Sequence, residues 1–229
     1  MNLNLETFNG LLVRRGAQGQ WDRGISSEVQ HEYHHADLKA AKVLVDIGAH
    51  IGAYVVHAKR VNPDLEVIAV EANAENAAIL RMNTVNLQDV TVFHARCGYK
   101  KHDDPVLLCD SLNTGGCTVC ERRDAETYIA SGTTGCHLEE VPILISLEDV
   151  FGEVERVNVL KIDAEGAEFD ILPGAKPATL KRVDCIVGEW HQTKEVFEAQ
   201  LVKPMAKLFD LVEARQTDQT LGYFCFKRK

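Results

Sequence analysis

The chain has 229 residues, of which 45% are hydrophobic and 26% are charged, and its formal net charge is −9. This length suits one sizeable domain with its own core, and the composition excludes intrinsic disorder. The negative charge argues against nucleic acid or an acidic membrane surface as a partner, so we expect a small-molecule partner.

The apolar runs at residues 43–49 and 157–162 are far shorter than the roughly 20 residues that a membrane span needs. Residues 1–10 also lack the basic start and hydrophobic stretch of a signal peptide. We therefore expect a cytoplasmic protein. Seven cysteines, an odd number without secretory features, argue against a disulfide framework. The sequence leaves the oligomeric state open, with a homodimer as one option.

Residues 1–40 are predicted to form a lead-in or lid segment, with a helix at about 26–38, before a main domain at 41–229. Strand and helix signals then alternate through "KVLVDIG", "GAYVVHAKRV", "LEVIAVEA", "NAENAAILRMNTVN" and "VTVFHARCG". This alternation predicts an α/β fold, namely a doubly wound parallel sheet.

The regular pattern stops at about 98–140, a stretch rich in Gly, Thr, Asp and Cys. Because a long irregular segment inside a domain is usually functional or mobile, we predict an insert near the site. Strand and helix signals return in "VPILISLEDVF", "VNVLKIDAEG", "EFDILPGAKPATLKR", "DCIVGEW" and "TKEVFEAQLVKPMAKL", and strands around "FDLVEARQ" and "LGYFCFKRK" follow.

The turn after the first predicted strand contains Asp46, Gly48, His50 and Gly52. Ligands of such sheets bind at the carboxyl ends of the strands, where glycines allow close approach of the backbone and the next helix offers free N–H groups. Glu71 ends the second strand, where an acid accepts the two hydroxyls of a ribose. Together these features predict an adenosine-containing ligand.

Two observations narrow the choice of ligand. The turn lacks the middle glycine of the G-x-G-x-x-G pattern, which disfavours a nicotinamide-dependent oxidoreductase. Asp46 would repel a phosphate, whereas it suits a ligand with a positive sulfonium and amino group. We therefore predict S-adenosylmethionine as the cofactor.

The sequence resembles the FkbM family of S-adenosylmethionine-dependent methyltransferases from about Trp21 to its end. The segments that carry the resemblance are "VDIGAHIG", "VEANAENAAILRMN", "SLEDV", "VLKIDAEGAEFDILPGA" and "IVGEWH". The resemblance implies a seven-stranded Rossmann-like sheet of the class I methyltransferase type with an antiparallel last strand. It also implies methylation of a hydroxyl on a sugar or a small natural-product-like acceptor.

Carried over by position, the resemblance assigns Asp46, Gly48 and Gly52 to the cofactor loop and Glu71 to the ribose. It places Ala95 and Arg96 at the adenine, with Cys97 departing from the small apolar residue expected there. It makes the lead-in residues Glu28, Glu32 and Tyr33 a cover for the cofactor, with Glu32 and Tyr33 on the substrate side. It makes the loop 111–116, with Asn113, a border of the acceptor pocket.

Candidate catalytic residues follow the fourth and fifth strands of the main domain. Asp163 is placed to orient or deprotonate an acceptor hydroxyl, with Glu165 beside it on the substrate side and Glu168 as a helix cap. Glu189 and His191 end the neighbouring strand. Because histidine titrates near neutrality, His191 is the predicted general base.

Two metal hypotheses remain open. Asp163, Glu165 and Glu189 offer oxygen ligands for Mg²⁺, which would acidify the acceptor hydroxyl. The four cysteines of the 98–140 segment offer thiolates for Zn²⁺, although free thiols are the preferred interpretation; they are Cys109, Cys117, Cys120 and Cys136. The histidines of "HEYHH" are interpreted as a solvated helix face.

Two alternative functions remain beside O-methylation. An N-methyltransferase would present an amine to the same carboxylates. A catalytically inactive, cofactor-binding partner subunit is the other alternative, and the presence of Asp163 and His191 beside an intact cofactor loop argues against it.

Overall fold

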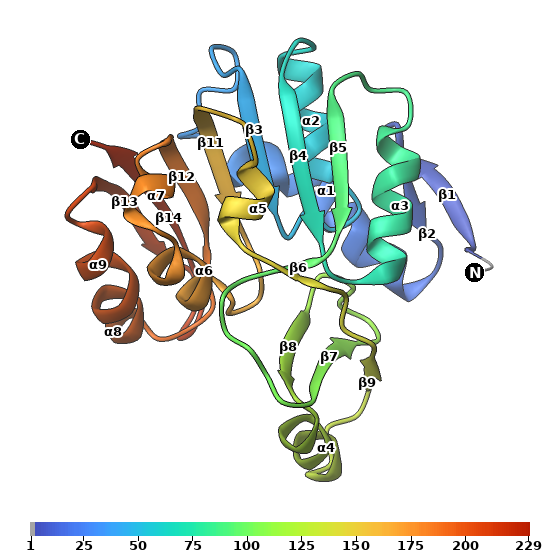
Figure 1. Cartoon of the computed structure of the whole chain (residues 1–229). Helices are drawn as coiled ribbons and strands as arrows, with labels where there is room; N and C mark the ends of the chain where they lie inside the picture. Colours follow the sequence, from blue (N-terminus) through green and yellow to red (C-terminus); the bar gives the residue numbers. More distant parts are fainter. Residues whose placement is uncertain (1–2) are drawn as a thin grey trace.

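The structure, a computed structural model, describes residues 3–229. Its centre is a seven-stranded sheet in the order β13-β14-β12-β11-β3-β4-β5 (Figure 1). The strands are β3 (Val43–Ile47), β4 (Glu66–Glu71), β5 (Val90–His94), β11 (Val157–Ile162), β12 (Val183–Trp190), β13 (Phe209–Gln216) and β14 (Gly222–Arg228). Neighbouring strands are parallel except that β14 runs antiparallel to both β12 and β13. The predicted doubly wound α/β fold with an antiparallel last strand is confirmed.

Helices cover both faces of the sheet. One layer contains α1 (Ala17–Glu32), α2 (Ala53–Val61) and α3 (Ala74–Thr84). The other contains α5 (Leu147–Phe151), α6 (Glu168–Gly174), α7 (Pro177–Leu180) and a continuous helical stretch of α8 (Lys194–Phe197), a π-helical turn (Glu198–Val202) and α9 (Lys203–Met205). Side chains along a strand alternate between the layers, so Val43 and Val45 pack in one core cluster and Leu44 in the other. None of the helices in residues 3–229 is both long and apolar enough to cross a membrane.

The amino-terminal segment is a hairpin of β1 (Leu5–Phe8) and β2 (Leu11–Arg14) followed by α1. The helix predicted at about 26–38 starts and ends earlier in the chain than expected. It begins after Gly16, whose φ of 78° turns the chain out of the hairpin, and ends where Tyr33 leaves the helical conformation. At Gly19 a Cβ atom would lie 1.8 Å from the Arg14 carbonyl oxygen. The missing side chain therefore lets the first turn of α1 pack against β2, although a glycine in the sequence usually indicates a turn.

Residues 98–140, predicted as an irregular insert, form a small sheet of their own below the carboxyl ends of the central strands (Figure 1). Its order is β8-β7-β9, with β7 (Pro105–Asp110), β8 (Cys117–Glu121) and β9 (Cys136–Glu139), and α4 (Arg122–Ala130) connects β8 to β9. A short parallel pair of β6 (Arg96–Cys97) and β10 (Leu144–Ile145) takes the chain out to the insert and back.

Candidate active site

A cavity of about 680 Å³ lies where the carboxyl ends of the central strands, α1 and the insert meet. We call one part of it the glycine end; it is lined by Gly48, His50, Glu71, Ala95 and Arg96. We call the other part the carboxylate end; it is lined by Glu32, Tyr33, Asp163, Glu165, Glu189 and His191. The cavity thus joins the predicted cofactor loop to the predicted catalytic residues.

The two glycines of the cofactor loop have different structural roles. Gly48 lines the cavity with φ of 77°, and a Cβ atom there would lie 1.7 Å from the Asp163 carbonyl oxygen. Only glycine therefore lets the turn after β3 pass so close to the end of β11. Gly52, with φ of 86°, does not line the cavity; a Cβ atom on it would lie 2.5 Å from Leu80, so it allows α2 to approach α3.

Asp46 does not face the cavity, which corrects its predicted contact with a cationic part of the cofactor. Its side chain is fully buried, and its Oδ1 lies 3.0 Å from the Lys161 Nζ. Lys161 also donates a 2.7 Å hydrogen bond to the Gly48 carbonyl oxygen. Burial lowers the pKa of Lys161, but the carboxylates of Asp46 and Asp163 outweigh burial and raise it, so the lysine stays charged. Asp46 therefore acts on the loop through a buried ion pair.

Glu71 occupies the position expected of a ribose ligand. Its Oε2 accepts a 2.8 Å hydrogen bond from the backbone N–H of His50, and its Oε1 accepts one of the same length from Asn73. Burial raises the pKa of Glu71, and these N–H groups oppose that effect. The Oε1 also accepts a longer, 3.5 Å hydrogen bond from the Asn76 side-chain amide. Because a carboxylate oxygen can accept two hydrogen bonds, the Oε2 of Glu71 can still bind a hydroxyl group from the cavity.

The His50 side chain anchors the insert. Its Nε2 lies 2.9 Å from the Thr114 Oγ1, and the Thr114 hydroxyl donates a 2.8 Å hydrogen bond to the buried Asp22 carboxylate. Since the hydroxyl has one proton, which goes to Asp22, the ring must donate to Thr114 through Nε2. Burial lowers the pKa of His50 to about 4, so the ring is neutral. Asn113, one residue earlier, lines the cavity.

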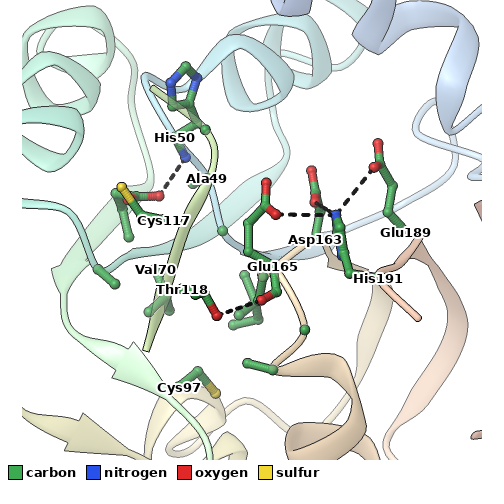
Figure 2. Close-up of a pocket in the computed structure, with 18 of the residues that line it drawn as sticks. Ala49, His50, Val70, Cys97, Cys117, Thr118, Asp163, Glu165, Glu189 and His191 are labelled. Atoms are coloured by element: carbon green, nitrogen blue, oxygen red, sulfur yellow. Dashed lines mark hydrogen bonds and ion pairs between the residues drawn. The ribbon is translucent and has the colours of Figure 1, made fainter. Parts of the chain in front are cut away.

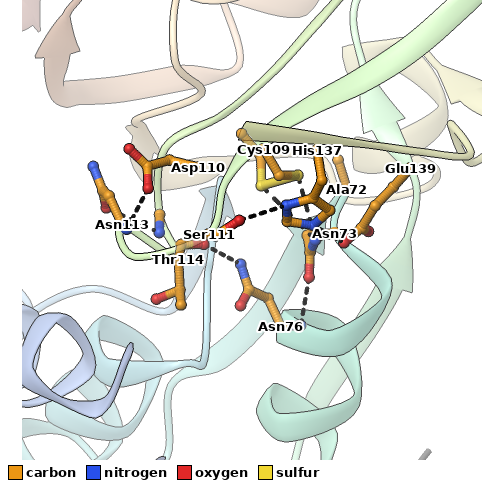
Figure 3. Close-up of a disulfide and its surroundings, with 12 residues drawn as sticks. Ala72, Asn73, Asn76, Cys109, Asp110, Ser111, Asn113, Thr114, His137 and Glu139 are labelled. Atoms are coloured by element: carbon orange, nitrogen blue, oxygen red, sulfur yellow. Dashed lines mark hydrogen bonds and ion pairs between the residues drawn. A yellow bond between two sulfur atoms is a disulfide. The ribbon is translucent and has the colours of Figure 1, made fainter. Parts of the chain in front are cut away.

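A disulfide joins two strands of the insert beside the cavity (Figure 3). Cys109 of β7 and Cys117 of β8 lie directly opposite each other and are bonded, and the Asn73 amide nitrogen contacts both sulfur atoms at 3.6 and 3.8 Å. This corrects the preferred interpretation of free thiols for these two residues, whereas Cys120 and Cys136 are free. The four cysteines therefore cannot supply four thiolates to Zn²⁺.

The predicted adenine residues follow β5. Ala95 is buried, and its N–H donates a 3.0 Å hydrogen bond to the Glu71 carbonyl oxygen. Arg96 lines the cavity with its Nε buried and without a hydrogen-bond partner among residues 3–229. Burial lowers the pKa of this guanidinium. Ala95 and Arg96 thus border the cavity where the prediction places the adenine.

At the other end, carboxylates converge on His191 (Figure 2). The His191 Nε2 lies 3.8 Å from Asp163, 3.6 Å from Glu165 and 3.7 Å from Glu189. The Nδ1 lies 2.8 Å from the Oε1 of Glu168, which is fully buried. Both ring nitrogens face carboxylates, so the ring is held as an imidazolium.

The charge of His191 argues against the prediction that this residue titrates near neutrality and acts as a base. Burial lowers its pKa, but the hydrogen bond to Glu168 and the charges of the surrounding carboxylates raise it to about 10. A ring that keeps its proton at neutral pH cannot accept another. His191 instead supplies the positive charge that lets several carboxylates share one site.

Two of these carboxylates have pKa values in the neutral range. Burial, with repulsion from Asp163, raises the pKa of Glu165 to about 7 and that of Glu189 to about 8, against the opposing charge of His191. The Tyr33 hydroxyl lies 3.3 Å from Asp163 and 3.4 Å from Glu189. The Tyr33 hydroxyl has one proton and can donate it to only one of the two carboxylates. The geometry therefore fits a protonated Glu189 that donates a hydrogen bond to the Tyr33 oxygen.

The residues predicted to bind Mg²⁺ do not form a free donor set. Asp163, Glu165 and Glu189 surround the His191 imidazolium, which already occupies the place of a cation. Asp163, Glu168 and His191 lie within 4.8 Å of one another through their ligand atoms, but a histidine ligand needs a bare ring nitrogen. The group fits an imidazolium better than a resident divalent ion.

Stability of the folded chain should depend on pH through His191. Its pKa is raised on folding, so its contribution is fully present below the unfolded value of about 6.5 and is lost as the pH rises towards about 10. We expect the difference in the free energy of unfolding between wild type and His191→Gln to shrink over this range. Urea denaturation at several pH values measures it; a constant difference would show that His191 is not charged in the folded state.

Two residues of the site, Lys161 and Tyr223, were not predicted from the sequence. Lys161 stands in the middle of a strand, where a charge usually points to solvent, and only the buried Asp46 on the neighbouring β3 explains its orientation. Tyr223 donates a 3.1 Å hydrogen bond to Glu32 from a strand far along the chain. The string "KIDAEG" was the available signal for Lys161, since the lysine stands two residues before the strand-end acid.

Comparisons with known proteins show the family to which the chain belongs. The Methyltransferase FkbM domain family matches residues 46–225. "Methyltransferase 1" of Beauveria bassiana (strain ARSEF 2860) is 28% identical over 166 residues, which cover 67% of this chain and 66% of that protein. The 31-O-demethyl-FK506 methyltransferase FkbM of Streptomyces tacrolimicus is 27% identical over 183 residues, which cover 69% of this chain and 68% of that protein. The chain thus spans about two thirds of the length of these relatives.

The fold also matches solved structures. A chain of the fibrillarin/Nop5p complex superposes with a TM-score of 0.53 at 13% identity, and the match covers 99% of this chain and 98% of that chain. At this identity the match concerns the arrangement of strands and helices.

Proposed function

Because the chain belongs to the FkbM methyltransferase family, we propose that it transfers the methyl group of S-adenosylmethionine to a hydroxyl of a small molecule. The observation that carries this proposal is the continuous cavity in which Glu71 and the Gly48 turn lie at one end and a carboxylate cluster at the other. The name of the Streptomyces relative, a 31-O-demethyl-FK506 methyltransferase, supports oxygen as the methyl acceptor.

The residues of the glycine end fit the cofactor. The Glu71 carboxylate would accept the ribose hydroxyls, the Gly48 turn would lie against the methionine part, and Ala95 and Arg96 would border the adenine. S-adenosylmethionine, when bound, supplies a methyl group activated by a positive sulfonium. The carboxylate end would then receive both the methyl group and the acceptor.

At the carboxylate end the protein must align the acceptor oxygen and remove its proton. In the transfer a carbon–oxygen bond forms, the carbon–sulfur bond breaks and its electron pair stays on sulfur, and the hydroxyl proton leaves to a base. Glu189 is our candidate base, since its pKa of about 8 suits proton transfer at neutral pH. Asp163 orients the acceptor hydroxyl, and the His191 imidazolium holds the carboxylates in place.

Cofactor binding is tested by calorimetric titration with S-adenosylhomocysteine, the product that binds without an acceptor. We expect micromolar affinity for wild type and at least tenfold weaker binding for Glu71→Gln, about 1.4 kcal/mol, because the amide accepts fewer hydrogen bonds from the ribose. Glu155→Gln, at an exposed acid remote from the cavity, is the matched control. Equal affinity of all three proteins would remove Glu71 from the cofactor site, and no binding by wild type would contradict the proposed function.

N-methylation is the second candidate, because an amine acceptor would meet the same carboxylates. Hydroxyl and amine acceptors are separated by screening both with S-adenosylmethionine and identifying the methylated atom by NMR. An N-methyl product without any O-methyl product would replace the O-methylation proposal.

A further inference from the structure

We propose that the methyl acceptor carries a positively charged group beside its hydroxyl, as an amino alcohol or an amino sugar does, and that Glu32 and Glu28 of α1 bind this group. The inference rests on the proposed function and names the substrate class of the same site. It follows from the charge, the unpartnered hydroxyl and the helix face at the carboxylate end.

The carboxylate end has an excess of negative charge. Glu28 and Glu32 from α1, Asp163 and Glu165 after β11 and Glu189 of β12 all line this part of the cavity. The two cations among the described residues there are His191 and Lys161, and the Lys161 Nζ lies 3.0 Å from the buried Asp46 and 3.6 Å from Asp163. The basic side chains of Arg96 and Lys100 come after β5, at the opposite side of the sheet. Because Glu165 and Glu189 have pKa values of about 7 and 8 and can hold protons, the negative charge that a cation would compensate lies mainly on the acids of α1 and on Asp163.

Repulsion between the acids is visible at Glu32. This residue is half-buried, and burial, together with the charges of Asp163 and Glu28, raises its pKa. Its Oε1 accepts the 3.1 Å hydrogen bond from the Tyr223 hydroxyl. A cation bound next to Glu32 would relieve the repulsion and offset the burial of the carboxylate.

One buried hydroxyl, on a residue that lines the cavity, has no protein partner among the described residues. Tyr54 lines the cavity with its ring centroid 5.1 Å from that of Tyr33; the residue is only 3% exposed, and its hydroxyl has no hydrogen-bond partner in the described part of the chain. Buried polar groups usually find partners, so an unpaired hydroxyl on a residue that lines the cavity indicates a polar ligand.

The helix α1 presents a single face to this ligand. Trp21, Ile25, Glu28 and Glu32 recur at helical spacing, and all four line the cavity. Trp21 is 48% exposed and lines the cavity two helical turns before Glu28, so an aromatic ring lies on the same helix face as the acids. Aromatic rings and carboxylates together bind organic cations, because the ring faces attract positive charge without strong hydration.

The position of His191 determines how the acceptor is oriented in the cavity. Its imidazolium lies among Asp163, Glu165 and Glu189 and repels a second cation from that point. The positive group of the acceptor therefore lies towards Glu28 and Glu32, and its hydroxyl points to Asp163 and Glu189. This orientation leaves Glu189 free to take the hydroxyl proton.

The test uses two probes of the same shape, choline and its neutral carbon analogue dimethylbutanol, which differ only in the charge. Binding to the full chain saturated with S-adenosylhomocysteine is followed by saturation-transfer NMR. We expect choline to bind at least tenfold more tightly than the analogue, and Glu32→Gln to weaken choline binding by about tenfold without affecting the analogue. The amide oxygen introduced by this substitution keeps an acceptor for the Tyr223 hydroxyl, and Glu155→Gln again controls for net charge.

Equal binding of the two probes, or no binding of choline at millimolar concentration, would overturn the inference, while S-adenosylhomocysteine binding would leave the proposed function standing. Failure of S-adenosylhomocysteine to bind would instead contradict the proposed function itself. If Glu32→Gln weakened S-adenosylmethionine but not S-adenosylhomocysteine, Glu32 would serve the sulfonium of the cofactor, and the inference would be wrong.

Discussion

Replacing Glu189 by glutamine is expected to lower kcat for methyl transfer by about 10² to 10⁴, the usual contribution of a general base. Glutamine keeps the shape of the side chain and an oxygen for the Tyr33 contact, but it cannot take a proton. Affinity for S-adenosylhomocysteine should stay within twofold or so of wild type, because Glu189 lies away from the glycine end. Transfer of a labelled methyl group to the acceptor found in the screen gives kcat.

The pH profile distinguishes a base from a merely structural carboxylate. A base must be unprotonated, so the wild-type rate should rise with pH through the pKa of Glu189, which is about 8 in the protein without ligands. Glu165→Gln is the matched comparison, since Glu165 contacts the same His191 nitrogen at 3.6 Å. If Glu165→Gln lost the pH-dependent step while Glu189→Gln kept it, the role of base would pass to Glu165.

The variant Lys161→Met is expected to lower the free energy of unfolding by about 3–5 kcal/mol. The fully buried Asp46 would lose its ion-pair partner, and an uncompensated buried charge is strongly destabilising. The Gly48 carbonyl oxygen would also lose its 2.7 Å hydrogen bond from the lysine. Urea denaturation followed by circular dichroism measures the change.

The double variant Lys161→Met with Asp46→Asn controls for the lost packing of the lysine. Removing both charges should recover a large part of the stability lost in the single variant, because the unpaired carboxylate is then gone. If the single and double variants were equally unstable, the pair would not interact as a buried ion pair in solution.

The sheet could be predicted from the sequence because its strands are buried on both faces and stand out as short apolar runs that end in Gly or an acid. The run before Gly48 and the run before Asp163 are examples. Glu71, Ala95 and His191 fall where their strands end, so the edge of the sheet places them in the cavity.

The properties of individual side chains could not be predicted in the same way. Asp46 turns away from the ligand because Lys161, more than a hundred residues later, lies on the neighbouring strand. The charge of His191 depends on carboxylates from two strand ends and a helix, and the Cys109–Cys117 bond depends on the register of β7 with β8. Such properties arise from pairings across the fold, which local periodicity does not contain.

The order of the central sheet also has a consequence for biosynthesis. The late strand β14 lies between β12 and β13, so β12, which carries Glu189, remains an open edge until residues 222–228 have left the ribosome. Before that point the nascent chain exposes the unpaired backbone of an apolar strand, which is a site for pairing with other chains. The wall of the cavity that holds the candidate base is thus completed late in synthesis, and a nascent chain that stalls before β14 would expose an edge for a chaperone to cover.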